Sequence, residues 1–241
     1  KNLTREGSSC LFCKSNVRFR TLMVALSQSL YGTTLPLSQF QKNKGIRGLG
    51  MSDWDGYATQ LARKFDYINT YYDVEPRFDI TQMPKEWISR FDFLISSDVF
   101  EHIVSPISAA FENAFKLLKP GGTLVLTVPF LPYGTTCEHF GELNEFEVVD
   151  DGKKKRLKNI SKDGTMQWFD DLIFHGGIGA TLEMREFTLP SLLLELRGAG
   201  FDEIKSFQKA VPSFGIPDAG PRSFPITARR PLAARGNSPA F

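Results

Sequence analysis

The chain has 241 residues, of which 41% are hydrophobic and 23% charged, and its formal net charge is +2. This composition excludes a disordered or fibrous chain, and the length fits one large α/β domain with additions, or two domains. The small net charge does not indicate a nucleic-acid partner, and no apolar run approaches the ~20 residues of a membrane helix. We therefore expect a cytoplasmic protein that binds neither nucleic acid nor a membrane.

The first 130 residues alternate between helical and strand patterns. Apolar residues recur at helical spacing over residues 17–31 and 107–118, and a further helix is predicted to begin at Ser52 or Asp53. Runs typical of strands are "DYINTYYDVEP" from Asp66, "FDFLISS" (91–97) and "TLVLTVPF" (123–130). Strands that alternate with helices of this length predict an α/β fold with a doubly wound, mostly parallel sheet.

The pattern changes after Pro132. Two Asp-Gly pairs, at Asp151 and Asp163, lie among short β-prone runs, which indicates an antiparallel β insertion. A helix with Thr188 as its N-cap and an edge strand "DEIKSFQ" follow, and the Pro-rich and Arg-rich end reads as an irregular tail. The predicted divisions are 1–35 (N-terminal segment and helix), 36–132 (core), 133–184 (β-rich cap), 185–212 (core helix and strand) and 213–241 (tail).

Four motifs follow predicted strands, at the edge where an open parallel sheet binds its ligands. They are the Gly48/Gly50 turn, the carboxylates Asp73 and Glu75, "FDIT" (78–81) and "SSDVFEH" (96–102). A nucleoside ligand needs such groups, because a turn without side chains admits its backbone and a carboxylate accepts its ribose hydroxyls. Each motif also has a plain alternative, since the glycines can serve a simple turn and the acids can be solvated.

The series "GLGMSD", "YYDVEP", "FDIT", "DFLISSDVFEHI" and "LLKPGGTLVLTVP" resembles the class I S-adenosylmethionine-dependent methyltransferases. Its most specific part is "SDVFEHI" followed by "LLKPGG", which is similar to the "VLEH…LKPGG" signature of many bacterial small-molecule enzymes, including an uncharacterised subgroup. The resemblance covers residues 40–130 and implies a Rossmann-like, seven-stranded sheet with an antiparallel edge hairpin. It also implies S-adenosylmethionine as the cofactor, bound across the strand ends.

The resemblance assigns cofactor contacts residue by residue. Gly48 and Gly50, with Met51, face the methionine part, and Ser97 lines the same side. Asp73 matches the acid that holds the ribose, with Glu75 as the alternative, and Asp79 and Ile80 meet the adenine. The first motif departs from the family, because Ser52 stands where a third glycine is usual.

A hydroxyl or amine acceptor usually needs a general base, for which histidine is the commonest choice. The chain has three histidines: His102, His139 and His175. His139 follows the last core strand, at the mouth where an acceptor would lie, and is the favoured base, with His175 second. His102 reads as structural, and a packed or surface role is the alternative for the other two.

Cys10 and Cys13 form a C-x-x-C pair, which is half of a zinc site. Cys137 and His139 could supply the other half, although two reduced thiols at a turn are the favoured interpretation. The leading function is therefore S-adenosylmethionine-dependent O- or N-methylation of a small molecule. The alternatives are a non-enzymatic binding module with a degenerate nucleotide fold and, with less support, a nicotinamide-dependent oxidoreductase or epimerase.

Overall fold

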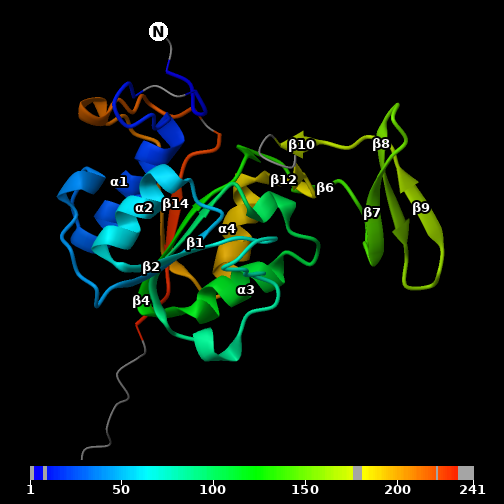
Figure 1. The fold of residues 1–241 in the computed structure, drawn as a ribbon, viewed down its shortest axis with the longest axis horizontal. Helices are drawn as coiled ribbons and strands as arrows, with labels where there is room; N and C mark the ends of the chain where they lie inside the picture. Colours follow the sequence, from blue (N-terminus) through cyan, green and yellow to red (C-terminus); the bar gives the residue numbers. More distant parts are fainter. Residues whose placement is uncertain (1–2, 8–9, 176–180, 221, 233–241) are drawn as a thin grey trace, which may run out of the picture.

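The structure is a computed structural model and describes residues 3–7, 10–175, 181–220 and 222–232 (Figure 1). Among these residues, no helix combines the length and the apolar character that crossing a bilayer requires. A central sheet and the helices on its two faces form the body of the molecule, and a smaller β-rich segment projects from it.

The central sheet has six strands in the order β13-β14-β4-β3-β1-β2. These strands are β1 (Arg47–Met51), β2 (Asp66–Thr70), β3 (Phe91–Ser97), β4 (Leu118–Thr127), β13 (Asp202–Ser206) and β14 (Ile226–Arg229). The first four pair in parallel, whereas β14 runs antiparallel to both β4 and β13. The sheet is therefore mostly parallel with an antiparallel hairpin at one edge, as predicted.

Helices cover both faces of the sheet, as the alternating sequence pattern predicted. They are α1 (Val17–Tyr31), α2 (Asp55–Lys64), α3 (Ser108–Leu117) and α4 (Leu189–Gly198), with short 3-10 turns η1 (Leu37–Gln39), η2 (Lys85–Trp87), η3 (Phe100–His102) and η4 (Pro212–Phe214). Leu22 and Leu26 of α1 pack with Leu61 of α2 against one face, and residues of α3 and α4 pack against the other. Each face thus has its own buried core.

Helix ends follow local chemistry. The Asn16 side chain accepts a hydrogen bond from the Phe19 amide at the start of α1, and Gly32 ends that helix in the left-handed conformation. Thr188 caps α4 as predicted. The predicted start of α2 was wrong: the helix begins at Asp55, because Ser52 has a positive φ of 56° and cannot serve as its N-cap.

Two predictions about the sheet were also wrong. The described sheet has six strands and not seven, because residues 72–90 after β2 form no strand. They contain bends, turns, η2 and a single bridge at Arg77, with prolines that cannot donate to a ladder. The tail 213–241 is not wholly irregular, because it contributes β14 to the interior of the sheet. Ile226 and Ala228 on this strand are each 1% exposed, which explains why the segment is ordered there.

The insertion after β4 divides into three small sheets. Its strands are β5 (Phe130–Leu131), β6 (Cys137–Glu138), β7 (Glu145–Asp150), β8 (Lys155–Ile160), β9 (Met166–Phe169), β10 (Phe174–His175), β11 (Thr181–Leu182) and β12 (Arg185–Thr188). These strands pair antiparallel, as predicted, except that β5 and β12 pair in parallel. The Asp-Gly pairs lie in the two turns of the β7-β8-β9 sheet, where Gly152 and Gly164 have positive φ.

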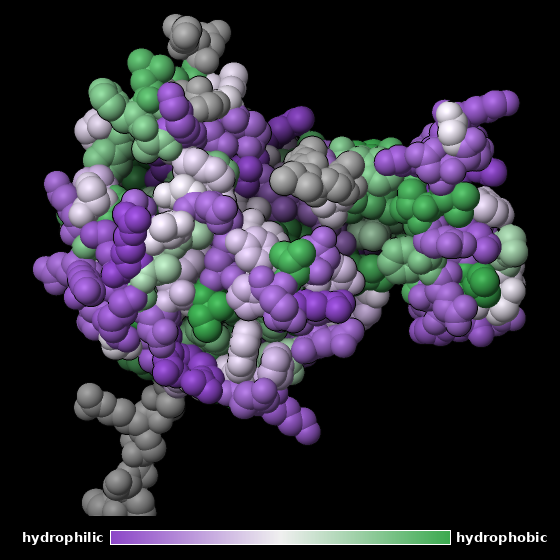
Figure 2. All heavy atoms as spheres, in the orientation of Figure 1, coloured by the Kyte–Doolittle hydropathy of each residue, from purple (hydrophilic) through white to green (hydrophobic). Residues whose placement is uncertain are grey.

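The β7-β8-β9 sheet does not cover the strand ends, contrary to the expected cap. It projects sideways from the body (Figure 1), and Trp168 on it is 41% exposed. Figure 2 shows hydrophobic side chains where this sheet adjoins the body and hydrophilic ones at its ends. Leu157 of β8 packs there with Phe140, Leu182 and Met184, so the sheet is anchored at its base.

Gly48 and Gly50 lie inside β1 and not in a turn after it, which corrects the predicted glycine turn. A Cβ atom on Gly48 would lie 2.1 Å from the Phe93 ring, and one on Gly50 would lie 2.0 Å from the Tyr67 hydroxyl. Both glycines thus admit large side chains of neighbouring strands into the core. The connection after β1 is formed by Ser52, Asp53 and Trp54.

Replacing Gly48 with Ala is expected to lower the free energy of unfolding by about 1–3 kcal/mol, because the Phe93 ring is fully buried and cannot move away cheaply. Denaturant unfolding followed by circular dichroism measures the change. Gly141→Ala is the matched control, since a Cβ there meets nothing within 4 Å, and its effect should stay within about 0.5 kcal/mol. Equal effects of the two substitutions would contradict this explanation.

Candidate active site

The connection after β1 is fixed by a buried carboxylate, Asp53. Its side chain accepts hydrogen bonds from the hydroxyls of Tyr57 and Tyr67, and its backbone amide donates to Asn69. Asp53 is 4% exposed. Burial raises the pKa of its carboxyl to about 7, although the two tyrosine hydroxyls and the charge of Arg18 act in the opposite direction. The carboxyl therefore holds its proton in the folded protein at mildly acidic pH.

This raised pKa predicts a pH dependence of stability. The folded state keeps a proton on Asp53 that the unfolded chain releases near pH 4. The contribution of this proton to the free energy of unfolding is therefore complete below pH 4 and is lost as the pH rises to about 7. Asp53→Asn removes this titration. On going from pH 4 to pH 8, the free energy of unfolding of the variant should therefore rise by roughly 2–4 kcal/mol relative to that of the wild type. Denaturant unfolding at both pH values measures the difference, and an unchanged difference would contradict the assignment.

The two acids expected to bind ribose lie beyond β2, not at its end. The strand stops at Thr70, and Asp73 and Glu75 lie on an exposed loop closed by pairing between Tyr71 and Arg77. Neither acid lies on a strand, although the run "DYINTYYDVEP" that contains them was predicted to be one. Glu75 accepts a hydrogen bond from the Arg77 amide at 3.0 Å. The irregular backbone after Tyr71 accounts for the difference, because the alternation of side chains holds only within a strand.

The remaining predicted cofactor residues lie close to strand ends or in the adjoining turn. Met51 ends β1 and is buried, and Ile80 is buried in the same core. The Asp79 carboxylate accepts hydrogen bonds from the amide and the hydroxyl of Thr81, at 2.8 and 2.7 Å. Ser97 is the last residue of β3, and its hydroxyl contacts Arg18. Ser97 and Met51 thus end neighbouring parallel strands.

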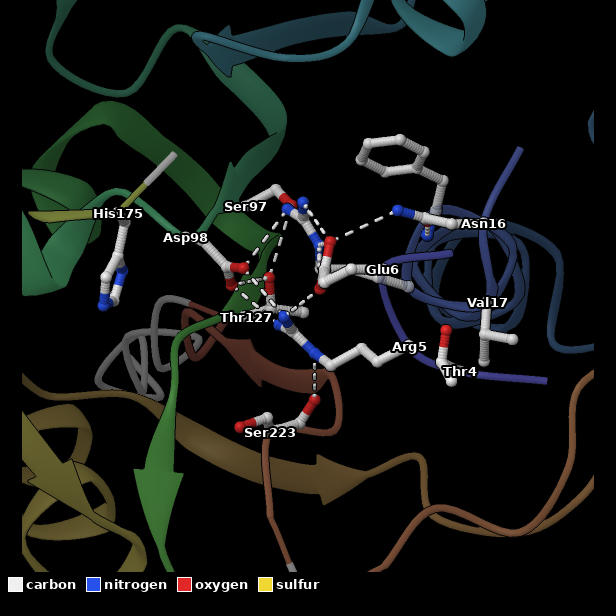
Figure 3. A network of polar contacts seen from close by, with 12 residues as sticks. Thr4, Arg5, Glu6, Asn16, Val17, Ser97, Asp98, Thr127, His175 and Ser223 are labelled. Carbon is white, nitrogen blue, oxygen red and sulfur yellow. Dashed lines mark hydrogen bonds and ion pairs between the residues drawn. The ribbon is translucent and has the colours of Figure 1, made fainter. Parts of the chain in front are cut away.

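A charged network covers the carboxyl end of β3 (Figure 3). The Arg5 guanidinium donates two hydrogen bonds to the Asp98 carboxylate, at 2.8 and 2.9 Å, and Thr127 donates a third at 2.8 Å. Arg18 lies 3.4 Å from the same carboxylate. Burial acts to raise the pKa of Asp98, but the hydrogen bond and charge of Arg5 outweigh it and hold that pKa below its usual value. The N-terminal segment therefore packs directly onto the strand ends.

Glu6 extends this network. Its carboxylate accepts hydrogen bonds from Arg18 Nε and Nη2, at 3.0 and 2.8 Å, and from the Asn16 side-chain amide at 3.3 Å. Glu6 is 52% exposed, whereas Arg18 is 15% exposed. A partly buried guanidinium therefore presents its donors to a carboxylate beside Ser97.

Three histidines and two glutamates meet next to this network, and we call them the carboxylate–histidine cluster: Glu101, His102, His139, His175 and Glu183. Glu183 joins two of the histidines, because its Oε1 lies 2.7 Å from His139 Nε2 and its Oε2 lies 2.5 Å from His175 Nε2. Oε1 of Glu101 lies 3.8 Å from both His102 Nε2 and His175 Nδ1. Figure 3 shows His175 beside Asp98, so the cluster adjoins the carboxyl end of β3.

Burial and mutual contact shift the titration of this cluster. Burial raises the pKa of Glu101 to about 7, although His175 acts against it. Interaction with Glu101 raises the pKa of His175, with the charge of Glu183 adding to it, and burial lowers the pKa of His102. His102 is therefore neutral at pH 7, and its ring can offer one nitrogen lone pair.

Arg185 positions the η3 turn that carries Glu101 and His102. Its side chain is fully buried, and its guanidinium donates to the backbone carbonyls of Phe100 at 3.0 Å and Ile103 at 2.6 Å. It also donates to the Glu138 carboxylate at 2.7 Å. Because β12 and β6 pair through these residues, Arg185 ties the insertion to the end of β3.

The three cysteines and His139, which the sequence offered as an alternative zinc site, are not brought together. The Cys13 amide donates to Cys10 Sγ at 3.5 Å, and contacts with Cys13 lower the pKa of Cys10 to about 7. Cys137 lies exposed on β6. Within the described part of the chain, Glu101, His102 and His175 have ligand atoms close enough to hold one metal ion. No cysteine belongs to this group.

His139 and His175, which the sequence singled out, both contact Glu183. The sequence did not single out Glu183, and Arg5 and Arg18 lie in a segment to which the resemblance does not extend. The signal for Glu101 and His102 was present in "SSDVFEH", which was identified as a strand-end motif. His102 was interpreted there as structural, and Glu101 was given no role.

An open, mostly parallel sheet with polar and charged side chains at the carboxyl ends of β1 and β3 defines a ligand-binding α/β protein. A family model described as "Methyltransferase domain" matches residues 34–204, and the chain belongs to this family. It is an S-adenosylmethionine-dependent methyltransferase, as its motifs predicted. A search of curated proteins gave no significant match.

Solved structures with distant similarity include 1,6-didemethyltoxoflavin-N1-methyltransferase from Burkholderia thailandensis, with bound 1,6-didemethyltoxoflavin and S-adenosylhomocysteine. It is 15% identical with a TM-score of 0.45, over 89% of this chain and 78% of that one. An S-adenosylmethionine-dependent methyltransferase from Mesorhizobium loti is 15% identical with a TM-score of 0.43, over 90% and 100%. A Bacillus halodurans protein described as a methyltransferase is 14% identical with a TM-score of 0.45, over 81% and 97%.

Proposed function

We propose that the chain methylates a hydroxyl or amine of a small molecule, with His139 as the general base. The observation that carries this proposal is the carboxylate–histidine cluster beside the carboxyl end of β3. Its histidines support the proposal because imidazoles are common proton acceptors and the cluster lies beside the strand ends at which this fold binds its ligands. The nearly balanced charge of the chain favours a small acceptor over a nucleic acid.

The residues at the strand ends fit the two charges of the methionine part of S-adenosylmethionine. Arg18 already holds a carboxylate, that of Glu6, through two donors and could hold the cofactor carboxylate in the same way. Asp98 offers an anion nearby for the ammonium group. Met51, Ser97 and the 52–54 connection would line this part, whereas Asp79 and Ile80 would meet the adenine. The exposed Asp73 and Glu75 are the candidates for the ribose.

The bound cofactor supplies a methyl group on a positively charged sulfur, so the protein must mainly align the acceptor and accept its proton. Glu183 orients His139 by its 2.7 Å contact, as the carboxylate of a catalytic triad orients its histidine. If Nε2 of His139 donates to Glu183, Nδ1 carries the lone pair that takes the acceptor proton. His175, held by the other oxygen of Glu183, is the second candidate for this role.

Transfer of labelled methyl groups tests the proposal. The full chain is incubated with S-adenosylmethionine carrying a radioactive methyl group and a panel of small phenols, alcohols and amines. The proposal predicts label in at least one hydroxyl or amine compound, with equimolar S-adenosylhomocysteine. Transfer only to carbon or sulfur acceptors, or to protein or nucleic acid, would contradict it.

A further inference from the structure

Three members of the carboxylate–histidine cluster converge on one point. Glu101, His102 and His175 each offer one ligand atom, and these atoms lie within 4.8 Å of one another. Both histidines are 3.8 Å from Glu101 Oε1, which is longer than a hydrogen bond. The three groups therefore surround a gap and do not bond one another directly.

The outer contacts of the two histidines determine which nitrogen faces this gap. Nδ1 of His102 lies 2.8 Å from the Leu182 carbonyl, and a carbonyl can only accept, so Nδ1 carries the proton. Nε2 of His175 lies 2.5 Å from the Glu183 carboxylate, which also accepts. Each ring, when neutral, thus turns a lone pair toward Glu101. Histidines that bind metals show this arrangement, with the other ring nitrogen donating to a carbonyl or a carboxylate.

Glu101 lacks the partners that a buried carboxylate requires. Its side chain is 0% exposed, and neither of its oxygens has a hydrogen-bond partner among the described residues. An unpartnered buried carboxylate is costly. A proton on Glu101 could bond one histidine nitrogen, but it would draw that contact to about 2.7–3.0 Å, whereas both contacts are 3.8 Å.

We propose that Glu101, His102 and His175 bind one divalent transition-metal ion of the zinc type. Two imidazoles and one carboxylate form a borderline donor set that suits Zn²⁺, Fe²⁺, Co²⁺ or Mn²⁺, whereas Mg²⁺ and Ca²⁺ prefer oxygen ligands throughout. Three protein ligands leave at least one coordination position open, as catalytic zinc sites do. The Leu182 carbonyl and Glu183 contact the nitrogens of His102 and His175 that face away from the ion, and so orient the two rings.

The ligand atoms lie close enough to bind one ion after side-chain adjustment. Ligands bound at about 2.1 Å with tetrahedral angles lie about 3.4 Å apart, so the two 3.8 Å separations need to close by about 0.4 Å. The remaining separation, at up to 4.8 Å, needs to close by about 1.4 Å at most. Arg185 fixes the backbone on both sides of Glu101 and His102, so rotation of the half-buried His175 ring is the simplest adjustment.

The site gives the proposed methyl transfer a further component, and this consequence rests on the proposed function. An acceptor hydroxyl at the open position would lose its proton more readily, because the ion stabilises the oxyanion. The proton would pass to His139, and the oxygen would bond the methyl carbon as the carbon–sulfur bond breaks. The sulfur keeps that electron pair, which leaves S-adenosylhomocysteine. The inference therefore favours hydroxyl over amine acceptors.

Metal titration of the full chain tests the site directly. The protein carries Cys10→Ser and Cys13→Ser, so that the C-x-x-C pair contributes no ligand, and is stripped with a chelator. Zn²⁺ alone and Mg²⁺ alone are then titrated by calorimetry, and Co²⁺ is followed by its visible absorption. We expect one Zn²⁺ per chain, a Co²⁺ spectrum with nitrogen and oxygen ligands, and no comparable binding of Mg²⁺.

Variants locate the ion. Glu101→Gln and His175→Ala should each weaken Zn²⁺ binding at least 100-fold, and Glu183→Gln by about 10- to 100-fold, because it only orients a ligand. His139→Gln is the matched control: it contacts Glu183 but lies outside the three ligands, so it should keep the stoichiometry and the Co²⁺ spectrum. Circular dichroism and S-adenosylhomocysteine affinity, measured without metal, check that each variant is folded.

The outcomes separate this inference from the proposed function. Absence of stoichiometric Zn²⁺ and Co²⁺ binding, or full binding by folded Glu101→Gln and His175→Ala variants, would overturn the metal site. The cofactor and base assignments would stand in that case if the protein still transfers methyl groups. Stoichiometric metal binding without any methyl transfer would instead support the site and overturn the proposed function.

Discussion

Replacing His139 with Gln is expected to lower the rate of methyl transfer by about 10²- to 10⁴-fold, the usual contribution of a general base. Gln retains a side chain that can reach Glu183 but cannot take a proton. The affinity for S-adenosylhomocysteine and the free energy of unfolding should change little, because His139 is a partly exposed residue of the insertion. Initial rates at saturating acceptor, with the acceptor found by the labelling panel, measure the effect.

The pH profile separates a base from a positioning role. If His139 is the base, His139→Gln should change the shape of the wild-type pH–rate profile as well as slow the reaction. A variant that slows the reaction but keeps the profile would assign the proton to His175. A variant with the wild-type rate would remove the base from this mechanism.

Arg185→Met is expected to cost about 2–4 kcal/mol of folding free energy, because two backbone carbonyls lose the donor that a fully buried guanidinium supplies, at about 1–3 kcal/mol for each unsatisfied group. The substitution leaves the Phe100 and Ile103 carbonyls without their donor and separates Glu138 from its cation. Thermal and denaturant unfolding measure the loss. Methyl transfer should fall too, because Glu101 and His102 lie on the turn that Arg185 fixes.

Arg47→Met is the matched control for Arg185. Arg47 donates to Asp66 at 2.8 Å, nearly the distance of the Arg185–Glu138 contact, but its side chain is 42% exposed. Exposed pairs contribute about 0–1 kcal/mol, so this variant should remain close to the wild type. Similar losses in both variants would show that burial is not what makes Arg185 important.

The body of the fold was predictable because its elements carry strong local signals. The α1 pattern gave the bounds Val17–Tyr31, and "FDFLISS" is β3, since an apolar run bounded by polar residues has few other solutions. The strand β14 was missed because the prolines and arginines around it dominate the composition of a short segment. The glycines of β1 were misplaced because the requirement for them lies in Phe93 and Tyr67, on neighbouring strands.

The site was only partly predictable, for a similar reason. The chain has only three histidines, so His139 and His175 could be singled out from the sequence. Their connection through Glu183 could not, because it depends on the pairing of β10 with β11 and on the contacts of the loop after β6. Asp73 kept the spacing of a ribose-binding acid, yet β2 ends three residues before it. The spacing of residues along the chain identifies a motif, but the path of the backbone determines where the side chains of that motif lie.

Titration of the full chain with S-adenosylhomocysteine, with NADH as the comparison ligand, tests the central claim most directly. Calorimetry should show one S-adenosylhomocysteine per chain and no binding of NADH, because the sheet edge carries charges that match the methionine part of the cofactor. Binding of NADH alone would indicate an oxidoreductase or epimerase. Binding of neither ligand would indicate a non-enzymatic module, and either result would contradict the assignment of this edge as a methyltransferase cofactor site.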